Sequence, residues 1–264
     1  MGNLEISLFG GFFLRVDGRQ ISGLVSNKGC ALFVYLAIES GRPHNRATLA
    51  SLFWPNQPEQ VSLTNLRQTL HRVGEILGSH TEEIPCFLVT NHAIQFNLSC
   101  SCSLDLNQFS QLLDACDKHH SPEEQLCEPC VDKLKAAVAI YHGNLLAGIS
   151  LPGCHDFQWW LTCRQEEYHL KVMRILKRLI AHYGLRGDFP QAIQYTRQAL
   201  ELEPWSELLH RRLIGLLASS HQRIAAIRQY EICRQILLRE YGVEPALETR
   251  SLYEEICSGG LGIE

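Results

Sequence analysis

One stretch near the middle of the sequence concentrates side chains that bind transition metals. Cys127 and Cys130 form a C-x2-C pair, the spacing that lets two thiolates hold one zinc ion. Cys116 lies one helical turn before His119 and His120, so Cys116 and either histidine can share a helix face. Because the loop between the two groups is short, these five residues predict a closed site with one structural zinc.

Two other interpretations of this stretch stay open. A C-x-x-C pair is also the spacing of a redox dithiol, although no thioredoxin-like βαβ pattern surrounds it here. Alternatively, the cysteines fill a core and the histidines are solvated. The chain has 11 cysteines, and without a signal peptide we expect reduced thiols. We interpret the remaining candidates, Cys100, Cys102, Cys154 and Cys163, as structural.

A second stretch, Val61 to Leu77, has a polar face of unusual composition. Apolar residues recur there every three or four positions and predict a helix with one buried side. The other side offers amides, hydroxyls, an imidazole and guanidinium groups, which can bond to base edges in a DNA major groove. The alternative is an ordinary solvated face. The predicted DNA-contacting residues are Thr64, Asn65, Gln68, His71 and Arg72, with Arg67 at the edge.

The elements around this helix have the order of a winged helix. Strands are predicted at 4–16 and 17–21, helices at 27–40, 45–54 and 61–77, and a hairpin at 86–98, with Asn27 and Asn45 as the N-caps of the first two helices. Lys28 and Arg46 lie in the first turns of their helices, and Asn91 and His92 lie at the hairpin tip. We therefore predict phosphate contacts for these four residues, with ordinary surface residues as the alternative.

The second half of the chain is predicted to be entirely helical. The sequence pattern indicates amphipathic helices at 104–120 and 128–143 and a long helix from about 156 to 183. An Ala-Ile pair at 192 recurs 34 residues later, which is the tetratricopeptide period. Trp159 and Trp160 could form an aromatic recognition surface, but helical spacing favours core packing together with Leu161, Tyr168 and Leu170.

Composition and charge limit the function classes. The 264 residues carry a formal charge of −4, and residues 1–98 hold equal numbers of basic and acidic residues, so a nucleic-acid surface has to be local. No apolar run is long enough to span a membrane, and we expect a soluble cytoplasmic protein with no membrane partner. No catalytic constellation stands out, which predicts a protein that is not an enzyme.

Together these features resemble the Streptomyces antibiotic regulatory protein (SARP) family. The resemblance implies a mainly α fold, with a winged helix-turn-helix at 1–100 and an all-helical, tetratricopeptide-like bacterial transcriptional activator domain at 101–264. The matching stretches are ISLFGGFFLRVDG, NKGCALFVYLA, NRATLASLFWP, NLRQTLHRVGEIL, AVAIYHGNLLAG, ALELEPWSELLHRRLIGLLA and LLREYGVEPALETRSLYEEI.

The resemblance also implies a function and partners. It implies a transcriptional activator that binds direct repeats in double-stranded promoter DNA as a homodimer and recruits RNA polymerase. The rival interpretation is a protein-interaction scaffold whose winged helix no longer binds DNA. Many relatives continue into ATPase or sensor domains, whereas this sequence contains no G-x-x-x-x-G-K-[ST] phosphate loop. A stand-alone activator and the front of a longer protein both fit.

Overall fold

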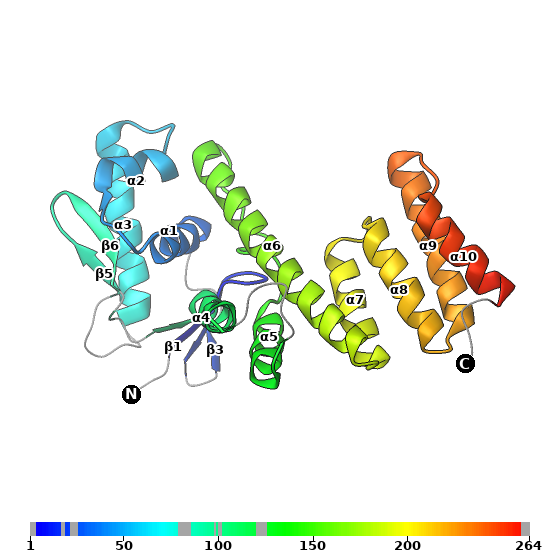
Figure 1. The fold of residues 1–264 in the computed structure, drawn as a ribbon. Helices are drawn as coiled ribbons and strands as arrows, with labels where there is room; N and C mark the ends of the chain where they lie inside the picture. The colour runs from blue at the N-terminus through cyan, green and yellow to red at the C-terminus, as the bar shows by residue number, and fades with distance from the viewer. Residues whose placement is uncertain are drawn as a thin grey trace. The chain divides into compact units, whose positions relative to one another are not determined.

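The computed structural model has the elements of a mainly helical protein. The described residues are 4–16, 19–21, 26–78, 86–97, 99, 102–119 and 126–259. They form ten helices and seven short strands, which confirms the predicted mainly α class with small β elements near the N-terminus (Figure 1). None of the helices in this part of the chain combines the length and apolar character needed to cross a bilayer.

The chain divides into two compact units, each discontinuous in sequence. The first unit comprises Met1–Asp114 and Ala139–His169, and the second comprises Ala115–Val138 and Leu170–Glu264. Residues 139–169 therefore join the N-terminal unit. The division into domains at 1–100 and 101–264 stays a prediction.

In the first unit, the N-terminal strands build one sheet. β1 (Leu4–Ser7) pairs antiparallel with β2 (Phe13–Val16), which pairs antiparallel with β3 (Arg19–Ile21). β7 (Cys102–Leu104) joins the other edge of β1 in parallel, giving the order β3-β2-β1-β7. α4 (Asp105–Asp117) follows β7 directly, so the sheet sets where α4 begins.

The glycine turn after β1 contacts a distant segment of the same unit. The backbone N–H of Gly10 donates to the carbonyl oxygen of Asn144 at 3.0 Å. Gly10 has φ +79°, and a Cβ there would lie 2.9 Å from the carbonyl oxygen of His142, so only glycine allows this approach. Next to it, Phe9 is buried and packs edge-on against Phe109 at 5.5 Å between ring centroids.

Three helices and a hairpin follow in the predicted winged-helix order. They are α1 (Asn27–Ile38), β4 (His44–Asn45), α2 (Arg46–Phe53), α3 (Glu59–Gly78), β5 (Phe87–Val89) and β6 (Ala93–Phe96), with β4, β6 and β5 in one sheet. The predicted Asn cap of α1 is wrong, because Ser26 Oγ accepts from the Gly29 N–H at 3.2 Å. Asn45 does cap α2, as predicted.

The long helix α6 (His155–Leu185) carries two adjacent tryptophans, Trp159 and Trp160, and we expected both to pack in the core. Trp160 lies against Tyr35, with 4.8 Å between ring centroids. Trp159 is 73% exposed, so the prediction of core packing is wrong for it. Neighbouring positions on a helix point about 100° apart, and only one of the two indoles can face the core. Leu170, also predicted to supply core bulk, is exposed as well.

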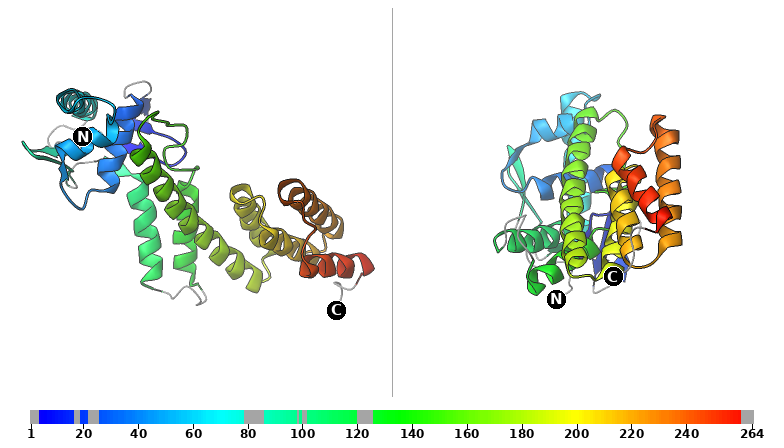
Figure 2. Two further views of the ribbon diagram at one scale, coloured as in Figure 1. Left: turned by 90° about the horizontal axis from the view of Figure 1, so that it is seen from above. Right: turned by 45° about the vertical axis from the view of Figure 1, so that its right-hand side comes forward.

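The second unit contains four consecutive helices that pack as two pairs. They are α7 (Phe189–Leu202), α8 (Glu207–Ser219), α9 (Arg223–Tyr241) and α10 (Leu247–Ser258). α8 packs against α7 and α9, and α10 packs against α8 and α9 (Figure 1; Figure 2). Ala192 and Ala226 are fully buried in the first helix of each pair, which agrees with the predicted 34-residue repeat.

Candidate nucleic-acid interface

α3 has one buried face and one polar, exposed face. Leu66, Leu70 and Val73 are buried, as the predicted apolar stripe requires, whereas the side chain of Leu77 lies outside the described residues. The predicted DNA-contacting residues lie off this stripe. Arg67, Gln68, His71 and Arg72 are exposed, and Thr64 and Asn65 are half-buried.

The turn between α2 and α3 is closed by a buried serine that sequence analysis missed. Ser62 Oγ lies 3.1 Å from the carbonyl oxygen of Trp54 and 3.3 Å from that of Gln57, and its hydroxyl donates to them. Ser62 lies four residues before Leu66, so it continues the buried stripe with a polar side chain. These bonds hold the end of α2 against the start of α3, which is the turn of the helix-turn-helix.

The wing formed by β5 and β6 borders one hollow together with the starts of α2 and α3. The lining residues are Asn45, Arg46, Ala47, Leu63, Arg67, Asn91 and His92. The structure therefore brings together three of the four predicted phosphate contacts with one arginine of α3. Guanidinium and amide groups are the donors that phosphates and base edges accept from.

Two hydrogen bonds attach the wing to α2 at this hollow. The N–H of Arg46 donates to the carbonyl oxygen of His92 at 3.1 Å, and Arg46 Nη1 donates to the carbonyl oxygen of Thr90 at 3.1 Å. A guanidinium carries five N–H donors, so one such bond leaves further donors for a ligand. Asn45 caps the same helix end, where the helix dipole also favours an anion.

Lys28, the fourth predicted phosphate contact, does not line this hollow. Its ammonium lies 5.1 Å from the centre of the Trp54 ring, in a cation–π contact. Trp54 caps the C-terminal end of α2, whereas Arg46 begins that helix. Any contact between Lys28 and DNA therefore involves a different phosphate from the one at the hollow.

Two predicted base-reading residues have partners within α3. The Thr64 hydroxyl donates to the carbonyl oxygen of Gln60 at 2.8 Å, which uses its donor. His71 Nδ1 lies 3.2 Å from Glu75 Oε2, and both side chains are largely exposed. An exposed contact of this kind contributes about 0–1 kcal/mol, so DNA could displace it at little cost.

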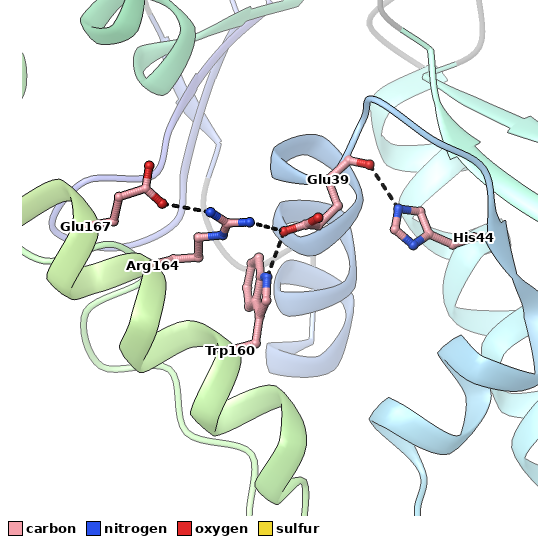
Figure 3. Close-up of polar contacts among 5 residues, drawn as sticks. All are labelled: Glu39, His44, Trp160, Arg164 and Glu167. Carbon is pink, nitrogen blue, oxygen red and sulfur yellow. Dashed lines mark hydrogen bonds and ion pairs between the residues drawn. The ribbon is translucent and has the colours of Figure 1, made fainter.

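A polar cluster joins the end of α1 to α6 within the first unit (Figure 3). Glu39 Oε1 accepts from Trp160 Nε1 at 2.9 Å and from Arg164 Nη2 at 2.5 Å, while Arg164 Nη1 donates to Glu167. Burial raises the pKa of Glu39, but the bonds from Trp160 and Arg164 outweigh it, so its pKa is lowered. His44 Nε2 lies 2.9 Å from the Glu39 carbonyl oxygen, and this contact fixes the turn after α1.

The predicted cysteine–histidine cluster is assembled in the second unit, where α4 ends and α5 (Glu128–Ile140) begins. His119 Nδ1 lies 3.5 Å from Cys127 Sγ and 3.4 Å from Cys130 Sγ. The Cys116 thiol lies close enough to Cys130 to affect its pKa. Three of the five predicted ligands, His119, Cys127 and Cys130, therefore lie together, with Cys116 near Cys130, and the fifth, His120, lies outside the described residues.

The cluster has a buried side and an exposed side. Cys116 and Cys130 are fully buried, Cys127 is half-buried and His119 is exposed. Burial, and then the neighbouring thiols of Cys127 and Cys116, raise the pKa of Cys130 to about 12.

Ion pairs to α6 hold both helix ends that carry the cluster. Asp117, beside Cys116, pairs with Arg174 at 2.8 Å and with Arg178 at 3.1 Å. Glu128, the first residue of α5, pairs with Arg186. The two chain segments of the cluster are therefore both anchored on the same helix.

The other cysteines differ in their surroundings. Cys154 is buried and its thiol donates to the carbonyl oxygen of Phe53 at 3.3 Å, in line with a structural role. Cys163 is exposed, and Cys100 lies outside the described residues. The expectation of reduced thiols is wrong for Cys86, which is disulfide-bonded, whereas the nine free cysteines agree with it.

Comparisons with known proteins agree with this architecture. The sequence model of the bacterial transcriptional activator domain matches residues 104–257, more than half of the chain. The chain is also 25% identical over 243 residues to the regulatory protein AfsR of Streptomyces griseus. That similarity covers 90% of this chain and 23% of AfsR, so the chain spans less than a quarter of that relative's length.

A solved structure shows the same fold. Mycobacterium tuberculosis EmbR, in complex with a low affinity phosphopeptide, matches with a TM-score of 0.69 at 18% sequence identity. The match covers 98% of this chain and 66% of the EmbR chain, and at this identity it speaks for the fold alone.

A winged helix joined to paired helices is the architecture of a transcriptional regulator. The match over residues 104–257 shows more narrowly that the chain belongs to the bacterial transcriptional activator domain family. The predicted resemblance to SARP-type regulators is thereby confirmed.

Proposed function

We propose that this regulator activates transcription by binding double-stranded promoter DNA, with α3 in the major groove and the wing on the adjacent backbone. The observation that supports it best is the hollow that unites the start of α2, the wing tip and Arg67 beside the polar face of α3. Three separate chain segments place hydrogen-bond donors there. A solvated helix face alone would not require this convergence.

Different residues take different roles in this proposal. On the exposed face of α3, the Gln68 amide suits adenine and the Arg72 guanidinium suits guanine, because each can form two bonds to that base edge. Arg46, Asn91 and His92 contact phosphates from the hollow and set the position of α3 along the groove.

The resemblance to SARP-type regulators supports further parts of the proposal. Two protomers bind direct repeats as a homodimer, and the helical pairs of the second unit supply surfaces for self-association and for RNA polymerase. The protein acts in the cytoplasm, where promoter DNA and polymerase are, and performs no chemistry of its own.

One observation favours the rival function of a protein-interaction scaffold. Residues 1–98 hold as many acidic as basic residues, and the acidic Glu75 lies on α3 next to His71. A segment without net charge gains little from the general attraction to phosphates that supports weak DNA binding. If the protein is a protein-interaction scaffold, it should therefore have no DNA affinity, even at low salt.

Selection from a random duplex library, followed by affinity measurements at several salt concentrations, distinguishes the two functions. We expect an enriched direct repeat, a steep loss of affinity with salt, and weaker base preference in Gln68→Ala and Arg72→Ala. Each lost base contact should cost about 1–3 kcal/mol of discrimination.

Matched controls come from the exposed surface of the second unit. Gln235→Ala and Arg228→Ala remove the same groups from α9, far along the sequence from α3. These variants should bind as the unaltered protein does. An absence of enrichment together with no binding at low salt would reject the DNA proposal and leave the scaffold.

A further inference from the structure

We propose that Cys116, His119, Cys127 and Cys130 bind one structural Zn²⁺ ion that joins the end of α4 to the start of α5. The ion is independent of DNA binding, because its ligands belong to the second unit and the candidate interface belongs to the first. Cys116 and His119 belong to the turn that ends α4, and Cys127 and Cys130 belong to the first turn of α5. The ligand atoms of His119, Cys127 and Cys130 lie close together.

The distances between ligand atoms match a tetrahedral zinc site. Zinc lies about 2.3 Å from a thiolate and about 2.0–2.1 Å from an imidazole nitrogen, which places the two ligand atoms about 3.6 Å apart. His119 Nδ1 lies 3.5 Å from Cys127 Sγ and 3.4 Å from Cys130 Sγ. Both distances therefore lie within about 0.2 Å of the separation expected for two ligands of one zinc ion.

Cys116 supplies the fourth ligand from the buried side. The ligand atoms of His119, Cys127 and Cys130 lie within 4.8 Å of one another, and Cys116 lies outside this group of three but close enough to Cys130 to affect its pKa. The Cys116 side chain therefore has to turn toward the ion when the site is filled. Four protein ligands close the coordination sphere, which is typical of structural zinc rather than catalytic zinc.

Local backbone structure sets the spacing of each pair. The carbonyl oxygen of Cys127 accepts from the N–H groups of Cys130 and Val131, both at 3.0 Å, so the two cysteines bracket the first turn of α5. The N–H of His119 donates to the carbonyl oxygen of Cys116 at 3.1 Å, which closes the corresponding turn after α4. A helix N-terminus also favours thiolates, the form that binds zinc.

Neither alternative explains all four side chains. Core packing accounts for Cys116 and Cys130, which are buried, but not for an exposed His119 ring beside two thiols. A redox dithiol accounts for Cys127 and Cys130 alone. A zinc ion would be bound by all four side chains. The ion pairs of Asp117 and Glu128 with α6 hold the two helix ends that carry these ligands.

The test begins with the metal content of the full chain, purified in reductant from cells grown without added metal. We expect close to one zinc per chain. After removal of zinc with a chelator, Co²⁺ should produce the visible bands of a tetrahedral site and a thiolate-to-cobalt charge-transfer band. Added Zn²⁺ should then abolish both signals, since zinc binds such sites more tightly than cobalt.

Single substitutions identify the ligands. Cys127→Ser and His119→Gln should each lower zinc affinity by more than the roughly 10–100-fold that loss of an outer-shell partner costs. Cys116→Ser should lower the charge-transfer absorbance by about a third, because one of three thiolates is lost. Cys233→Ser and Cys257→Ser, one buried and one exposed in the same unit, should retain full zinc.

The unaltered protein decides the question even where a variant fails to fold. Purification without zinc, together with octahedral cobalt bands and no charge-transfer band, would overturn the proposal. A Cys127–Cys130 disulfide, found after the native protein is alkylated without reductant and lacking zinc, would overturn it in favour of the redox dithiol. Zinc retained in full by Cys127→Ser or His119→Gln would likewise reject this ligand set.

Discussion

The polar face of α3 and the cysteine–histidine cluster place their side chains in opposite ways. Gln68, His71 and Arg72 are exposed and point away from the core of their unit. The ligand atoms of Cys127, Cys130 and His119 instead converge and lie within 4.8 Å of one another. Divergent side chains suit a large partner that presents many groups of its own, whereas convergent ones suit a single ion.

This difference predicts which property each site controls. Exposed groups on α3 add little to folding, so their removal should change binding and leave stability as it is. Convergent polar groups are partly buried, and their removal leaves neighbours without partners, so stability should fall as well.

The two faces of α3 allow the sharpest test. Leu66→Ala should lower the free energy of unfolding of the first unit by about 2–5 kcal/mol, because Leu66 is fully buried. Gln68→Ala, on the exposed face, should change it by no more than about 0.5 kcal/mol. Hydrogen exchange of the α3 amides in urea measures both. Equal destabilisation by the two variants would mean that the outer face is structural.

Asp105 is a site where several hydrogen bonds converge on one side chain and stabilise the fold without a ligand. Its Oδ2 accepts from the N–H groups of Leu8 at 2.7 Å and Phe9 at 3.0 Å, and its Oδ1 accepts from Leu106 at 2.8 Å. Asp105→Ala leaves these donors without their acceptor and should cost about 2–3 kcal/mol. Denaturant unfolding followed by tryptophan fluorescence measures the loss, and Asp105→Asn, which keeps one acceptor, should lose less. A neutral Asp105→Ala would contradict this role.

The Glu39 cluster should have a smaller, pH-dependent effect. Arg164→Ala removes a charged donor from Glu39 and should cost about 1–2 kcal/mol at pH 7, because the pair is partly exposed. The pKa of Glu39 is lowered from its ordinary 4.5, so its contribution to stability is complete above that value. It is lost as pH falls through the lower, folded pKa.

Unfolding experiments at pH 7 and pH 3 check this sign. The difference between the unaltered protein and Arg164→Ala should shrink as the pH falls toward the folded pKa of Glu39, because protonation removes the charge that pairs with Arg164. Arg174→Ala, which removes an ion pair of the second unit, serves as a control for general loss of charge. A difference that grows on acidification would contradict the assigned role of Glu39.

Substitution of Glu75 should have the smallest effect on stability, and it tests whether the end of α3 lies in the DNA major groove. Glu75→Gln breaks an exposed pair with His71 and should change stability by no more than about 0.5 kcal/mol. It should raise DNA affinity a few-fold at low salt, because one carboxylate leaves the face of α3. Fluorescence anisotropy with the selected duplex measures this gain. Unchanged affinity would mean that the end of α3 lies outside the groove.

Local spacing in the sequence was enough to predict most elements and their faces. The buried stripe of Leu66, Leu70 and Val73 follows from helical periodicity, and the Asn45 cap follows from its side chain. Cys127 and Cys130 lie on one turn because two intervening residues place them there. Each of these features depends on a few neighbouring residues, which is why sequence alone determined them.

Tertiary structure decided which surfaces meet. Periodicity places Trp159 and Trp160 on α6 but does not say that only Trp160 reaches Glu39, 121 residues away. The hollow between Arg46 and the wing likewise depends on the packing of separate segments. Such contacts depend on how separate elements pack against one another. Helical periodicity shows which face of a helix is apolar but does not show which other element packs on that face.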